Sequence, residues 1–185
     1  TELRLLRVYR TLAATQPSRI VPTFLGAHVV PAEHRADRQV YLRLLLDQMI
    51  PAVAAAKLAV CCDVFVEDTA FSVDEARAIF RAGKAAGLAP KLHADQLSAG
   101  GGAELAAEVG AWSADHLECS SDAGIAAMAA AGVVAVSLPI ATLYLRQQPM
   151  PARNFIAAGV PVAVATDFNP GSAPSWDLPL AMMLA

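Results

Sequence analysis

Runs of apolar residues alternate along the chain with stretches whose apolar positions recur at helical spacing. The apolar runs predict strands at residues 19–27, 61–66, 90–94, 113–118, 133–139 and 161–166, and helical stretches lie between and after them. These strands are apolar on both faces, as are strands of a parallel sheet that helices cover on both sides. The pattern therefore predicts an α/β protein built from about six consecutive β/α units.

Capping residues mark several of the predicted helices. The stretch from Ser72 to Gly87 begins with a serine, has Glu75 three residues later and ends at a glycine, which is a capping box followed by a glycine stop. Further helices are predicted over residues 37–57, 102–109, 121–131 and 151–159, and another begins near residue 175.

Polar residues at the ends of several strands decide between an open doubly wound sheet and a barrel. His28 follows the first strand, His93 ends the third, His116 lies in the fourth, and Asp167 follows the sixth. Barrel enzymes build their sites from several strands at this face, and no G-x-G-x-x-G follows a strand here. We therefore expect residues 1–185 to form an incomplete (β/α)8 TIM-type barrel, with the missing units outside this sequence.

Composition and charge narrow the function classes. Of the 185 residues, 56% are hydrophobic and 17% are charged, which suits strands buried on both faces. The net charge of −3 gives no basic surface for nucleic acid, and no apolar run is long enough to span a membrane. Three cysteines, two of them adjacent, form a poor disulfide framework, and the N-terminus lacks a signal-peptide core. We expect a protein of the reducing cytoplasm.

The residues at the strand ends are typical metal ligands. Imidazole and carboxylate groups suit zinc or iron, although a single buried histidine is more often a core residue. Strand alternation predicts that His93 and Asp95 share a face, while Gln96 enters the following loop. The tautomer of a buried His116 would be set by a flanking acid or by a backbone carbonyl. On local sequence alone, Asp167 is equally well explained as a helix cap in a turn.

Several segments resemble the imidazolonepropionases, a family of the amidohydrolase superfamily. The resemblance rests on "TFLGAHVVPAEH", "KLHADQLSAGGGAELAAEVGAWSADHLE" and "VPVAVATDFNPGSAP", and it extends over nearly the whole chain. The combination of "HADQ", a following "GG" and "TDFNPG" is the most specific part. The resemblance implies a (β/α)8 barrel with one zinc or iron ion. It also implies hydrolysis of the ring C–N bond of 4-imidazolone-5-propanoate to N-formimidoyl-L-glutamate in histidine degradation.

The resemblance also implies a role for each matching residue. His93 and Asp167 would bind the metal, and Asp167 would carry protons between the attacking water and the leaving nitrogen. His116 would polarise the attacked carbonyl, so that Asp167 and His116 are the catalytic pair. The remaining matches would contact the substrate, and they are His28, Gln96, Asn169, Gly171 and Ser172. The partner is thus a small molecule; the sequence leaves the oligomeric state open and allows a homodimer.

The sequence departs from the family pattern in its missing parts. The family's first barrel strand supplies a His-x-His pair of ligands, and a small β domain is built from both chain ends; neither is present here. The resemblance therefore implies that these residues are the central part of an enzyme about twice as long. Two alternatives stay open: another amidohydrolase acting on a cyclic amide or aminated base, and an inactive structural fragment.

Overall fold

The computed structural model describes residues 2–185, which divide into two compact units, one ending at Lys91 and the other comprising Leu92–Ala185. Helices and strands alternate, and the order of the strands follows the chain from β1 to β6. The pairs β1–β2, β4–β5 and β5–β6 are parallel. This arrangement confirms the predicted α/β class, and its strand order is that of successive β/α units in a barrel.

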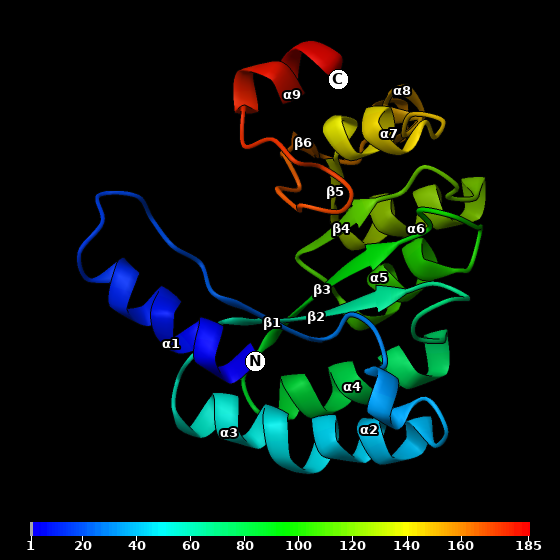
Figure 1. The fold of residues 1–185 in the computed structure, drawn as a ribbon. Helices are drawn as coiled ribbons and strands as arrows, with labels where there is room; N and C mark the ends of the chain where they lie inside the picture. The colour runs from blue at the N-terminus through cyan, green and yellow to red at the C-terminus, as the bar shows by residue number, and fades with distance from the viewer. Residues whose placement is uncertain (1) are drawn as a thin grey trace. The chain divides into compact units, whose positions relative to one another are not determined.

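The first unit carries two paired strands and the helices that pack on them (Figure 1). Its elements are α1 (Glu2–Ala13), β1 (Thr23–Ala27), the 3-10 turn η1 (Ala32–His34), α2 (Arg38–Leu44), the π-helical η2 (Leu45–Met49), α3 (Ile50–Ala55), β2 (Cys61–Val66) and α4 (Val73–Ala85). The predicted helix over residues 37–57 is confirmed as the run from α2 to α3. The capping box of α4 is present, because Ser72 and Glu75 bond each other's backbone N–H groups.

Strand β3 (Ala89–Ala94) leads into the second unit. The elements that follow are α5 (Gly102–Val109), β4 (Ser113–His116), α6 (Asp122–Ala131), β5 (Val134–Ser137), α7 (Pro139–Leu145), α8 (Ala152–Ala157), β6 (Val162–Val164) and α9 (Leu178–Leu184). Helix α5 packs against α6, and Figure 1 shows both beside β4. A small apolar cluster joins α7 and α9 through residues that include Leu138, Ile140 and Ala181.

Three boundaries differ from the sequence prediction. β1 begins at Thr23 rather than at residue 19, directly after Pro22, whose ring removes a backbone donor. β6 ends at Val164, so Asp167 lies in the loop rather than at the strand end. Helix α7 begins at Pro139, where the prediction placed the end of a strand and no helix. Among residues 2–185, no helix has both the length and the apolar character that crossing a bilayer requires.

Candidate metal centre

Three side chains of the second unit converge beyond the ends of its strands. They are His93 near the end of β3, His116 at the end of β4 and Asp167 three residues after β6. Each offers one ligand atom, and these atoms lie within 4.8 Å of one another. Residues that are 23 to 74 positions apart in sequence therefore form one cluster, as the strand-end positions predicted.

The two imidazole rings lie side by side but differ in burial. Their centroids are 5.6 Å apart, with the ring planes tilted by 49°. His116 is buried, whereas His93 is partly exposed. The cluster thus combines one buried imidazole with one that is partly exposed.

Asp167 is the carboxylate of the cluster, and its surroundings act on it in opposite directions. Burial raises the pKa of Asp167 above its usual value, while His116, His93 and a hydrogen bond from Ser172 lower it. The Ser172 hydroxyl lies 3.4 Å from Asp167 Oδ2. Desolvation is the largest of these effects, so Asp167 binds a proton more readily than an exposed aspartate does.

The backbone takes an unusual conformation at the ends of these strands. Asp95, His116, Leu117 and Asp167 all have positive φ, at 50°, 80°, 68° and 50°. Non-glycine residues enter this left-handed region at a cost of about 1–2 kcal/mol. Such conformations concentrate at functional sites, where the surrounding structure holds them in place.

The positive φ at Asp95 overturns one expectation from strand alternation. β3 ends at Ala94, and the backbone turn sends the Asp95 carboxylate away from the His93 face. Its oxygens accept hydrogen bonds from Gly102 N, Ala103 N and the Ser120 hydroxyl, at 2.9, 3.0 and 2.9 Å. Asp95 therefore caps α5 and ties the loop before α6 to the end of β3.

A buried acid lies behind His116. Glu118 Oε2 is 3.8 Å from His116 Nδ1, and Glu118 Oε1 accepts a hydrogen bond of 2.8 Å from the Thr142 hydroxyl on α7. The sequence pointed to an acid beside His116, but Thr142 is 24 residues further along. The sequence near His116 does not indicate the contact of Thr142 with Glu118, because this contact depends on how α7 packs.

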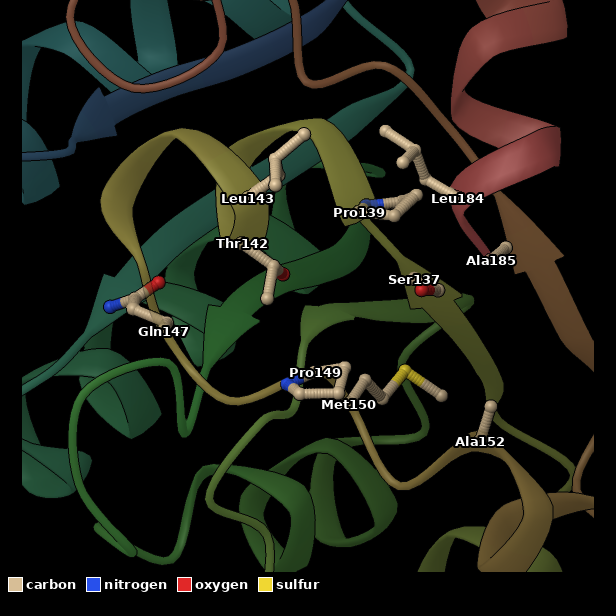
Figure 2. Close-up of a pocket in the computed structure, with 10 residues that line it drawn as sticks. All are labelled: Ser137, Pro139, Thr142, Leu143, Gln147, Pro149, Met150, Ala152, Leu184 and Ala185. Carbon is tan, nitrogen blue, oxygen red and sulfur yellow. The ribbon is translucent and has the colours of Figure 1, made fainter.

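Gln96 lies close to a pocket formed by α7 and the segment after it. Gln96 Nε2 is 3.5 Å from Gln147 Oε1, and Gln147 lines a cavity of about 230 Å³. Figure 2 shows Gln147 and Thr142 on one side of this pocket and Leu184 and Ala185 on the other. A second residue of the pocket lining, Thr142, bonds Glu118, which lies beside His116.

The residues after Asp167 form a tight loop with its own hydrogen bonds. Asn169 Oδ1 accepts from Gly171 N at 2.9 Å, and the Asn169 and Ala173 backbones bond each other. Ser172 bonds Asp167 as described, so this hydroxyl orients the carboxylate. Substrate contact by Asn169, Gly171 and Ser172 stays a prediction.

His28 is the one predicted site residue that lies in the first unit. It follows β1, and its ring centroid lies 5.7 Å from that of Phe65 on β2. Contact between His28 and the substrate stays a prediction.

The cluster fits a single metal ion. Two imidazoles and one carboxylate are the ligand types that zinc and iron share in proteins, and catalytic zinc takes three protein ligands. His116 is buried, and it lies beside the other two donors of the set. The structure adds His116 to the predicted ligand pair of His93 and Asp167 as a third side chain within reach.

Comparison with curated proteins identifies relatives over the whole chain. The chain is 53% identical over 186 residues to an imidazolonepropionase of Myxococcus xanthus (strain DK1622), and 53% identical over 184 residues to one of Geobacillus kaustophilus (strain HTA426). Both matches cover all of this chain but only 44% and 43% of the relatives. The chain thus spans less than half the length of these relatives, and no family model matches it.

Solved structures show a related fold at low sequence identity. A guanine deaminase from C. acetobutylicum matches all of this chain and 48% of its own, with a TM-score of 0.74 and 12% identity. An adenosine deaminase from Xanthomonas campestris with bound zinc matches 95% of this chain and 43% of its own, with a TM-score of 0.66 and 17% identity. At these identities the likeness concerns the fold alone, and it agrees with the predicted fold class.

Proposed function

We propose that this chain, which is homologous along its whole length to part of the imidazolonepropionases, is the central portion of such an enzyme. The enzyme would hydrolyse the ring C–N bond of 4-imidazolone-5-propanoate to give N-formimidoyl-L-glutamate. The observation that carries the proposal is the convergence of His93, His116 and Asp167, within a chain that is 53% identical to named imidazolonepropionases.

The same cluster supports binding of one zinc or iron ion. His93 and Asp167 would hold it, with His116 beside them. When bound, the ion would act as a Lewis acid that polarises the attacking water and the ring carbonyl. The donor set does not separate zinc from iron, because both accept imidazole and carboxylate ligands.

Asp167 would move the protons of the reaction. The hydroxide portion of a water adds to the ring carbonyl carbon, and the proton that it gives up would pass to Asp167. The ring C–N bond then breaks, and the same proton would go to the departing nitrogen, so that one water is consumed in total. The raised pKa of Asp167 favours this role, because a base with a pKa nearer neutrality also serves better as an acid.

His116 would stabilise the negative charge that develops on the carbonyl oxygen. A preorganised N–H donor in a buried position is worth more than the same donor in water, because it needs no reorganisation during the reaction. Gln96, Asn169, Gly171, Ser172 and His28 would contact the substrate, as the resemblance implies. A reducing compartment such as the cytoplasm stays a prediction, and so does a homodimer.

The test compares Asp167→Asn with wild type in the full-length protein that contains these residues. Turnover of imidazolonepropionate should fall by at least about a hundredfold, since general acid–base catalysis contributes roughly 10²–10⁴-fold. The matched control is Asp177→Asn, which changes an exposed aspartate that caps α9. Asparagine is an equally good cap, so the control should keep wild-type turnover.

Two outcomes would contradict the proposal. Activity of the Asp167→Asn variant within tenfold of wild type would remove its assigned role. Wild-type turnover of other cyclic amides or aminated bases that exceeds turnover of imidazolonepropionate would favour a different amidohydrolase activity. The metal assignment has its own measurement: elemental analysis of His93→Ala should show lost metal, and full occupancy would exclude His93 as a ligand.

A further inference from the structure

Two buried polar atoms face each other next to the cluster without forming a hydrogen bond. His116 Nδ1 and Glu118 Oε2 lie 3.8 Å apart, and their side chains are 4% and 2% exposed. Neither atom has a hydrogen-bond partner among the described residues. Leaving such an atom unpaired costs about 1–3 kcal/mol, so a shift of less than an ångström that closed this pair would be favourable.

The other oxygen of Glu118 is already held in place. Thr142 Oγ1 lies 2.8 Å from Glu118 Oε1 and 3.3 Å from the carbonyl oxygen of Leu138, one turn earlier in the chain. Thr142 is buried on α7, so its hydroxyl has a fixed position. A carboxylate anchored through one oxygen presents the other in a defined direction, and here that direction is toward His116.

We propose that Glu118, anchored by Thr142, is a positioning residue for His116. Its Oε2 would hold the Nδ1 edge of the ring and so direct the Nε2 edge at His93, Asp167 and the substrate carbonyl. This inference rests on the proposed function. A carboxylate behind an imidazole fixes its tautomer and ring orientation, and removing such a partner costs about 10–100-fold in activity or metal affinity.

Glu118 is favoured over the other acid that flanks His116 in sequence. Asp115 Oδ1 lies 3.2 Å from the Ser113 hydroxyl, whereas the Glu118 carboxylate faces His116 Nδ1. Glu118 also has the anchor on α7 that a positioning group requires. The proposal therefore assigns the orientation of His116 to Glu118 and Thr142 together.

The kinetic test uses the full-length protein. Glu118→Ala should lower kcat by about 10–100-fold and leave KM within threefold, because the change affects the group that acts on the developing charge. Glu118→Gln should lower kcat less, since its amide can still hydrogen-bond to Nδ1. Thr142→Val should lower kcat several-fold, and Thr142→Ser, which restores the hydroxyl, should recover at least half of wild-type kcat.

Glu104 provides the matched control. It is a partly buried acid of the same unit, with one oxygen bonded to the Ser121 hydroxyl at 2.6 Å and the other buried without a partner among the described residues. Glu104→Ala therefore reproduces the loss of a hydroxyl-anchored carboxylate with one buried, unpartnered oxygen. A kcat loss in Glu104→Ala equal to that in Glu118→Ala would mean a purely structural effect and would overturn the proposal.

A second measurement does not depend on turnover. Imidazole nitrogen chemical shifts, recorded by long-range proton–nitrogen NMR on the 185-residue chain, report the hydrogen bonding of each His116 nitrogen. Glu118→Ala should shift the Nδ1 resonance of His116, because it removes the carboxylate beside that nitrogen, whereas Glu104→Ala should leave the resonance in place. An unchanged Nδ1 resonance in Glu118→Ala, or kcat within threefold of wild type, would refute the inference. If wild type fails to hydrolyse imidazolonepropionate but the Nδ1 resonance changes as expected, the proposed function fails while the positioning role stands.

Discussion

Replacing Asp95 with asparagine tests the contact on which the geometry of the cluster depends. Asp95 is 1% exposed, and its two oxygens satisfy the Gly102 N–H, the Ala103 N–H and the Ser120 hydroxyl. Asparagine keeps one acceptor oxygen and places an NH₂ group where the other was. Whichever way the amide turns, at least one buried donor loses its acceptor and faces another donor.

The structure sets the size of the expected loss. A buried donor left unpaired costs about 1–3 kcal/mol, and hydrogen bonds to a charged acceptor are worth about 1.5–3 kcal/mol each. Because one or two of the three bonds are lost, Asp95→Asn should reduce the free energy of unfolding by about 2–4 kcal/mol. The change should also affect the candidate metal site, since Cys119 N bonds Asp95 O at 2.7 Å and Leu117 N bonds Ala94 O at 3.0 Å, which ties the segment after His116 to the end of β3.

Urea unfolding of the 185-residue chain at pH 7, followed by circular dichroism, measures this loss. Asp122→Asn is the control, because Asp122 is an exposed aspartate in the first turn of α6 and should contribute less than about 1 kcal/mol. Zinc binding should weaken in Asp95→Asn and stay unchanged in the control. A loss below 1 kcal/mol in Asp95→Asn, or one equal to that of Asp122→Asn, would refute the assignment of Asp95 as the anchor.

Three further changes test other parts of the fold. Gly102→Ala should destabilise the chain by about 1–3 kcal/mol in urea unfolding, because its Cβ would lie 2.6 Å from that of Ala94; a neutral result would contradict this close approach. Ser72→Ala should cost about 0.5–2 kcal/mol by removing one half of the α4 capping box, and an unchanged melting temperature would contradict that role. Burial raises the pKa of Cys62 from 9.0 to about 12, so its stabilising effect is complete below pH 9 and is lost as the pH rises toward 12. Between pH 8 and about pH 10.5, wild type should therefore lose about 2 kcal/mol more stability than Cys62→Ala, and equal losses would refute the shift.

Much of the fold could be predicted from the sequence because the alternation of strands and helices follows from local patterns of apolar and capping residues. Apolar runs located the strands, and caps such as Ser72 located helix starts. Helix α7 was missed because it begins at a proline without a side-chain cap, and its apolar residues read as the end of the preceding strand. No helix is predicted from the sequence where α1 lies, although Leu3 and Leu6 have helical spacing.

The candidate site was predictable only in part. Because the carboxyl ends of parallel strands in a barrel meet at one face, the sequence predicts that His93, His116 and Asp167 lie close together. The structure places them in one cluster. Strand alternation failed at Asp95, because the strand ends one residue earlier and the backbone turns there. The contact of Thr142 with Glu118 could not be predicted, since it depends on tertiary packing rather than on spacing.

The position of Asp167 has a consequence for anyone who engineers this chain. Asp167 has a positive φ of 50° and a carboxylate whose burial raises its pKa, and both features disfavour the folded state. Glycine at this position would remove both. A directed-evolution screen scored by heat resistance alone would therefore enrich chains that have lost the Asp167 carboxylate. Selection that is meant to keep this carboxylate has to score the candidate site as well as heat resistance in every round.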